Sequence, residues 1–150
     1  PYKSLGEFTV QNVKVQPKGW QGFKFPETKA KFVKIVFKDG YGGYINGNAL
    51  RLKGKIDDSA PAAEKKAAVD GIDIVAEKNG GTLVYAPNDV WKILNKDHEN
   101  FSKNRSGATY DGEAVWSFKD GKPATFDRIE VLVQQREDYT LKTFEVLAGD

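Results

Sequence analysis

The stretch AKFVKIVFKDGYGGYINGNALRLKG, residues 30–54, decides the fold class of this chain. Its first part places Val33, Ile35 and Phe37 on one side of an extended backbone. Its last part, residues 49–55, alternates leucine with arginine and lysine. Successive side chains of a β-strand point to opposite faces, so this alternation predicts strands with one buried face. Glycine, tyrosine and asparagine lie between the two runs and predict a loop there.

Short strand-like runs recur along the rest of the chain. The run TFDRIEVLV, residues 125–133, sets Ile129 and Val131 on one face and Arg128 and Glu130 on the other. Turns rich in Gly, Asn and Asp separate the runs, and this pattern predicts an all-β fold, an antiparallel β-sandwich or barrel. The predicted strands cover residues 6–10, 13–15, 22–25, 31–37, 49–55, 72–76, 81–86, 113–118, 125–133 and 142–148.

Other segments depart from this pattern. A proline directly after residues 22–25 is expected to stop that strand, because proline lacks the N–H that a ladder needs. The segment 57–70 is rich in Ala, Lys and Glu. It is either a helix with Pro61 in its first turn or a semi-rigid linker, and we interpret it as a connector. Residues 88–96 are a short helix candidate. Trp116 alternates with apolar neighbours and is predicted to lie in the core.

Composition excludes several classes of function. The chain has 150 residues, enough for one domain with a sizeable core. It carries 23 basic and 21 acidic residues, a balance that argues against nucleic acid as a partner. No apolar run is long enough to span a membrane. The chain has no Cys and one His, so a thiolate zinc site or a catalytic triad is not expected. Carboxylate pairs fall only in predicted turns or the connector, so we do not expect an enzyme.

Two stretches resemble a known family. Residues 30–54 resemble the closing part of a discoidin domain, also called a coagulation factor 5/8 type C domain, with its aromatic Gly-rich loop and final strand. VWKILNKDHENFSKN, residues 90–104, and GEAVWSFKDGKPATFDRIEVLV, residues 112–133, resemble its opening part. The resemblance is to the bacterial, galactose-binding-like members. It implies a jelly-roll β-sandwich, with the two halves in reversed order.

The reversed order suggests a circular permutation. Residues 1–56 resemble the family's C-terminal half, residues 71–150 its N-terminal half, and residues 57–70 link the two. Joined end to end, FEVLAGD and PYKSLGEFTV read as a strand, a turn and a strand. The chain is either a permuted single domain, 1–150, or a slice through tandem domains whose natural linker is 57–70. A monomer is expected, with a domain-swapped assembly as the alternative.

The resemblance also implies a function and a site. Bacterial relatives are mostly non-catalytic carbohydrate-binding modules, extracellular or periplasmic, that bind a glycan through loops at one end of the sandwich. A sugar needs an aromatic ring for its apolar face and planar polar groups for its hydroxyls. Trp20 also suits a purely structural place at the sandwich edge. The candidate ligand residues on such loops are Trp20, Tyr41, Tyr44, Asn46, His98, Phe101, Arg105 and Tyr110.

Calcium is the second feature of the family. Many relatives hold one Ca²⁺ around an acidic loop and a glutamate on the last strand. Here Asp97 matches one acidic position, but Asn95 and Asn48 stand where the other charges are expected. Because Ca²⁺ favours charged oxygen ligands, a weak site or none is expected, and Asp97 serves equally well as a turn residue.

Animal relatives offer an alternative function. They bind phospholipid or protein, so a protein- or membrane-surface interaction module is the second hypothesis. Such a module needs exposed apolar side chains beside basic ones at loop tips. Trp20 beside Lys18, and Phe101 beside Lys103, fit this requirement weakly.

Overall fold

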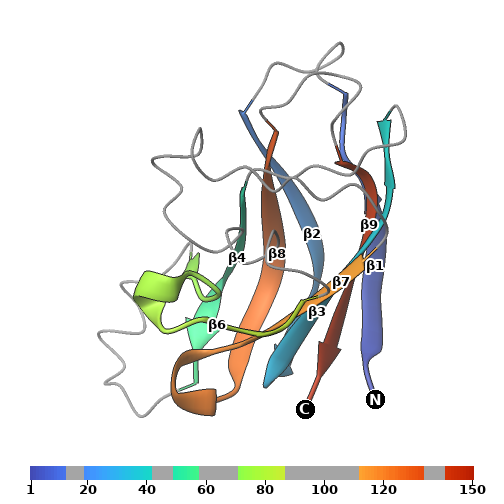
Figure 1. The fold of residues 1–150 in the computed structure, drawn as a ribbon. Coiled ribbons are helices and arrows are strands. Elements are labelled where there is room, and N and C mark those ends of the chain that lie inside the picture. The colour runs from blue at the N-terminus through green and yellow to red at the C-terminus, as the bar shows by residue number, and fades with distance from the viewer. Residues whose placement is uncertain (13–18, 42–48, 58–70, 87–111, 134–140) are drawn as a thin grey trace.

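The computed structural model describes residues 1–12, 19–41, 49–57, 71–86, 112–133 and 141–150. These residues form two antiparallel sheets that pack face to face, so the predicted all-β sandwich is confirmed (Figure 1). Within this described part, the helical segments are two three-residue 3-10 turns, Glu77–Asn79 and Lys119–Gly121. The segments 57–70 and 88–96 and the predicted strand 13–15 lie outside the described residues, apart from Asp57.

The five-stranded sheet has the order β1-β9-β3-β7-β6, and the four-stranded sheet has the order β2-β8-β4-β5. The strands of the first sheet are β1 (Lys3–Thr9), β9 (Leu141–Gly149), β3 (Phe32–Gly40), β7 (Gly112–Ser117) and β6 (Thr82–Tyr85). The strands of the second sheet are β2 (Gly19–Ala30), β8 (Ala124–Val133), β4 (Ala49–Ile56) and β5 (Ile72–Asp73).

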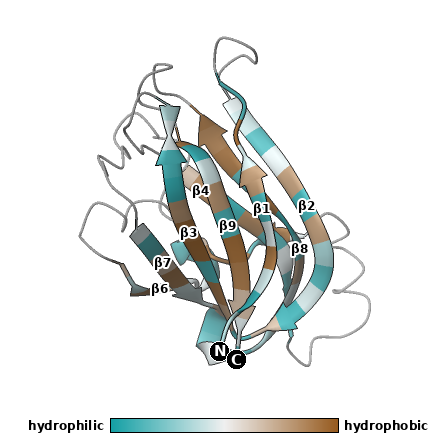
Figure 2. Cartoon of the chain, turned by 90° about the vertical axis from the view of Figure 1, so that its right-hand side faces the viewer, coloured by the Kyte–Doolittle hydropathy of each residue, from teal (hydrophilic) through white to brown (hydrophobic). Residues whose placement is uncertain are grey.

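The core lies between the sheets and is rich in phenylalanine. The ring of Phe144 packs edge-on against Phe23, with centroids 5.2 Å apart, and 5.7 Å from Phe8. Trp116 is fully buried, as its alternation predicts. Figure 2 shows the apolar and polar bands that alternate along β2 as its side chains turn inward and outward. The alternation of Val33, Ile35 and Phe37 also buries all three.

Two expectations about strand ends were wrong. β2 does not stop before Pro26 but continues to Ala30. β2 is an edge strand, and its pairing with β8 is irregular between Lys24 and Thr28, so Pro26 interrupts no regular ladder. The predicted strand 72–76 is shortened to β5.

The chain turns after β5 because Asp73 organises a local turn. The carboxylate oxygen Oδ1 of Asp73 accepts a hydrogen bond from the backbone N–H of Val75, and its carbonyl accepts one from the N–H of Ala76. Ile74 and Val75 remain fully buried, so their apolar character reflects the core rather than a continuing strand.

The chain ends lie side by side. β1 and β9 are antiparallel neighbours in which Lys3 is opposite Ala148, and both termini lie at the same end of the sandwich (Figures 1 and 2). Likewise β4 pairs with β5, with Gly54 opposite Ile72. The connector 57–70 therefore joins antiparallel neighbours, and a strand-turn-strand join of the termini is sterically simple. Both relations suit the predicted permutation, which stays a prediction.

Six strand ends gather at the opposite end of the sandwich, which we call the upper end. β1, β3 and β8 finish there, and β2, β4 and β9 begin there (Figure 1). These strand ends flank residues 13–18, 42–48 and 134–140. Residues 87–111 follow β6 and precede β7: β6 ends lower on the sheet, with Tyr85 opposite Val115, and β7 begins opposite Phe37. The upper end therefore carries the segment 42–48, whereas 87–111 starts lower on the five-stranded sheet.

Candidate functional site

The outer face of the four-stranded sheet carries polar side chains along β8. We call Arg51, Arg128 and Glu130 the array. In a sheet, directly opposed residues on neighbouring strands share a face. From the upper end downward, the register sets four rows on this face: Trp20–Leu132–Ala49, Gly22–Glu130–Arg51, Lys24–Arg128–Lys53 and Lys29–Thr125–Lys55.

Glu130 is the centre of the upper part of this face. Its side chain is only 9% exposed, although it points away from the hydrophobic core. One carboxylate oxygen, Oε1, accepts a hydrogen bond from Nε of Arg51, and Oε2 lies 2.9 Å from Nη2 of Arg128. A buried carboxylate is tolerated when its oxygens are paired in this way. The two guanidinium groups are thereby fixed in position on the sheet.

Gly22 makes room for one of these guanidinium groups. A Cβ atom at Gly22 would lie 2.7 Å from Nη2 and 3.0 Å from Nε of Arg128, closer than real contacts allow. The guanidinium therefore lies across the backbone of β2. The side chain of Arg128 is 42% exposed, yet its Nε is buried and has no hydrogen-bond partner among the residues described.

Trp20 lies on the same face, near the upper end. The guanidinium carbon of Arg51 is 3.8 Å from the centroid of the Trp20 ring, a stacked cation–π arrangement. Because Arg51 is also bound to Glu130, the ring is held against a fixed neighbour. Trp20 is half-buried on the outer face of an edge strand and lies outside the hydrophobic core.

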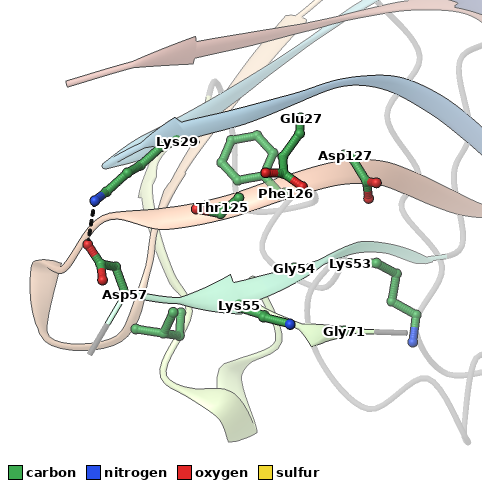
Figure 3. A pocket seen from close by; sticks show the side chains of 11 residues that line it. Glu27, Lys29, Lys53, Gly54, Lys55, Asp57, Gly71, Thr125, Phe126 and Asp127 are labelled. Carbon is green, nitrogen blue, oxygen red and sulfur yellow. Dashed lines mark ion pairs between the residues drawn. The ribbon is translucent and has the colours of Figure 1, made fainter. Parts of the chain in front are cut away.

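A groove of about 380 Å³ continues this face toward the lower end (Figure 3). Lys53 and Lys55 of β4 line one wall, and Glu27 of β2 and Asp127 of β8 line the other. Asp127 faces outward because it is an extra residue in β8, where the pairing with β4 shifts register. Apart from Lys29 and Asp57 at its lower part, the groove thus has a basic wall and an acidic wall.

An ion pair crosses the lower part of the groove. Nζ of Lys29 lies 2.7 Å from Oδ2 of Asp57, and the two residues come from opposite sides of β8 (Figure 3). Both side chains are largely exposed, so the pair contributes little stability. The Lys29–Asp57 pair links β2 to the end of β4 across the outer face of β8, at the level of Thr125.

Asp73 is the titratable group with the largest perturbation on this sheet. Burial raises its pKa from 3.8 to about 6, although hydrogen bonds from the backbone N–H groups of Leu52 and Val75 oppose the shift. These hydrogen bonds give Asp73 a structural role at the edge of the sheet. Within the part of the chain described, no group of three or more Asp, Glu or His is placed to hold a metal ion.

Of the eight residues predicted to bind ligand, the structure describes Trp20 and Tyr41. The Tyr41 hydroxyl donates to the carbonyl oxygen of Val10 over 2.7 Å, and Nζ of Lys142 lies 5.6 Å from its ring. Tyr41 therefore ties the end of β3 to the end of β1, at the upper end. The remaining predicted residues lie outside the described part of the chain: Tyr44, Asn46, Asn48, Asn95, Asp97, His98, Phe101, Arg105 and Tyr110.

The array around Glu130 was missed from the sequence. Arg128 and Glu130 were placed on the outward face of their strand, which is correct. Their partner Arg51 is 79 positions away from Glu130, and only the register of β4 on β8 brings the two together. Outward polar residues on two predicted strands were the only available signal.

Comparison with protein-family models gives no match, and comparison with curated proteins gives none either. The resemblance to discoidin domains therefore rests on the quoted residues. In the described ranges, no helix is long and apolar enough to cross a membrane.

Proposed function

We propose that this protein is a non-catalytic carbohydrate-binding module of the discoidin type. The observation that carries the proposal is the groove on the outer face of the four-stranded sheet, with Lys53 and Lys55 on one wall and Glu27 and Asp127 on the other. An extracellular or periplasmic location goes with this function.

The two walls offer complementary hydrogen-bonding groups. An ionised carboxylate only accepts hydrogen bonds, and a lysine ammonium only donates them. A sugar hydroxyl does both, so neighbouring hydroxyls of a pyranose can donate to Glu27 or Asp127 and accept from Lys53 or Lys55. The groove is shallow and open to water, which predicts dissociation constants of about micromolar to millimolar.

Trp20 supplies the apolar contact that sugar binding also needs. The C–H face of a pyranose packs on an aromatic ring. Arg51 lies against the Trp20 ring, and the proposal assigns the apolar contact with the sugar to this aromatic residue. A glycan that contacts both Trp20 and the groove would run along the outer face of β8.

This site differs in part from the one that the family resemblance implies. The resemblance places ligand contacts on the loops of the upper end. Trp20 lies at that end, whereas the groove extends from the array toward the lower end. The loop residues and the weak Ca²⁺ site of Asp97, Asn95 and Asn48 stay part of the proposal.

A glycan array tests the proposal, run once with Ca²⁺ and once with EDTA. Any saccharide that binds is then titrated against Trp20→Ala and a matched control, Tyr2→Ala. Tyr2 has its own cation partner, with Nζ of Lys34 4.9 Å from its ring, but it lies beside the five-stranded sheet. Loss of one aromatic contact predicts about two- to tenfold weaker binding in Trp20→Ala. Tyr2→Ala is expected to bind as the unmodified protein does.

Equal loss in both variants, or no saccharide bound at millimolar concentration, would contradict the proposal. If EDTA abolishes binding and Trp20→Ala does not weaken it, a metal site at the upper end would be responsible. The outer face of the sheet would then not bind that saccharide.

A further inference from the structure

Three basic side chains lie side by side on the outer face of the four-stranded sheet. Arg128 of β8 is directly opposite Lys24 of β2 on one side and Lys53 of β4 on the other. Directly opposed residues have Cβ atoms about 4.5–5.5 Å apart, and like charges in that arrangement destabilise a sheet. We call Lys24, Arg128 and Lys53 the cation row. Packing alone gives no reason for it.

The carboxylate next to the row does not neutralise it. Glu130 binds Arg128, but it also binds Arg51, so one negative charge serves two guanidinium groups. Neither Lys24 nor Lys53 forms an ion pair with another residue of the described ranges.

Asp73 lies opposite Lys53 on β5 but is turned toward the backbone. Its Oδ1 accepts hydrogen bonds from the N–H groups of Leu52 and Val75, at 3.1 Å and 3.3 Å. At the directly opposed positions of the row and of the row above it, Lys24, Arg128, Lys53 and Arg51 outnumber Glu130 and Asp73, while Glu27 and Asp127 border these positions toward the lower end.

Arg128 is held ready to bind an anion. Gly22 and Glu130 fix its guanidinium across β2, and its side chain is still 42% exposed. The exposed edge of a rigid, planar guanidinium matches the two oxygens of a planar carboxylate. The lysines on either side add charge and mobile donors.

We propose that the cation row is an anion subsite that takes the carboxylate of a uronic acid residue within the bound glycan. This inference rests on the proposed function and names its ligand class, an acidic saccharide. Lys53 belongs both to the row and to the groove, so the subsite is continuous with the groove.

The acidic wall limits where the negative charge of the glycan can lie. Glu27 and Asp127 lie next to the row, where they repel a second carboxylate and accept hydrogen bonds from hydroxyls. The preferred ligand therefore alternates acidic and neutral sugars.

The test uses a hyaluronan hexasaccharide, in which uronic acid alternates with a neutral sugar, and the same hexasaccharide with its carboxyl groups methyl-esterified. Titration calorimetry compares the unmodified protein, the double variant Lys24→Gln/Lys53→Gln and the control Lys31→Gln/Lys122→Gln. The control removes the same charge at two exposed positions outside the row.

The acidic hexasaccharide is expected to bind the unmodified protein and the control equally, and to bind the row variant about tenfold more weakly, since two partly exposed charge contacts are lost. Raising the salt to about 0.5 M should weaken this binding, because it screens exposed charges. Because the row is repulsive, its variant should unfold at an unchanged or higher urea concentration.

Three outcomes overturn the subsite. If the ester binds as tightly as the acid and loses affinity in Trp20→Ala, the carbohydrate function stands and the anion subsite fails. If polyglutamate of equal charge competes as well as the acidic hexasaccharide, the row recognises charge without sugar. Failure of every saccharide, acidic or neutral, would remove the proposed function itself and the subsite with it.

Discussion

Replacing Asp73 by asparagine should stabilise the protein in a pH-dependent way. The carboxyl of Asp73 is largely buried at the edge of the four-stranded sheet, and burial raises its pKa from 3.8 to about 6. The native state therefore binds a proton more tightly than the unfolded state does. Ionisation of Asp73 consequently costs the fold stability as pH rises.

The magnitude follows from the pKa difference. A shift of about two pKa units corresponds to about 3 kcal/mol between the two protonation states. Below about pH 3 the carboxyl is protonated in both states, so the penalty is absent. It grows as the pH rises through 3.8, where the unfolded state ionises, and levels off above about pH 7, where the native state is ionised as well. The asparagine side chain of the variant would stay neutral throughout, and its carbonyl oxygen can accept the same N–H groups of Leu52 and Val75.

Urea denaturation at a series of pH values from about 3 to 8 measures this effect. The free energy of unfolding of Asp73→Asn minus that of the unmodified protein should rise by about 3 kcal/mol across the window and then level off. Taking the difference cancels the titration of other groups. Asp127→Asn removes a carboxylate at an exposed position and is the control for net charge. A difference that is flat with pH, or that falls as pH rises, would refute the reasoning.

Three further predictions concern the array, the core and the chain order. Glu130→Gln leaves two partly exposed guanidinium groups without their carboxylate and should lower the free energy of unfolding by about 1–2 kcal/mol in urea titration. Glu113 is paired with Lys34 but its side chain is 44% exposed, so Glu113→Gln should cost less than about 1 kcal/mol, and equal losses in the two variants would contradict the role of burial. Phe144→Ala opens a cavity between the sheets and should lower the free energy of unfolding by about 3–5 kcal/mol in the same urea titration. A loss of less than about 1 kcal/mol would mean that the aromatic side chains of the core repack freely. The chain order can be changed by joining Asp150 to Pro1 with a short glycine linker and opening the chain within 58–70. This protein should keep the all-β circular dichroism spectrum and cooperative unfolding, because β1 and β9, and likewise β4 and β5, are antiparallel neighbours. An unfolded product would contradict the permutation.

Hydrophobic alternation was sufficient to predict the sandwich. Val33, Ile35 and Phe37, like Leu50 and Leu52, are buried where their spacing places them, because a half-buried strand repeats every two residues. Local sequence did not predict where pairing becomes irregular. β2 continues past Pro26 because it is an edge strand, a property of the sheet order that no local pattern encodes.

Register explains why the groove and the array were missed. Glu130 is recognisable in the sequence as an outward residue, but its burial depends on Arg51 of another strand and on the space left by Gly22. The outward position of Asp127 depends on an extra residue in β8 that changes the alternation. Trp20 was singled out from its residue type alone, and its stacking on Arg51 follows from the same register.

The measurement that tests the central claim most directly is an NMR titration of the ¹⁵N-labelled protein with the saccharide that binds best. If the outer face of the four-stranded sheet is the binding site, the backbone amides of β2, β8 and β4 should shift progressively, with the largest changes near Trp20, Arg128 and Lys53, and those of β1 and β9 should not move. Shifts confined to the five-stranded sheet, or no shifts at saturating saccharide, would contradict the claim that this face binds carbohydrate.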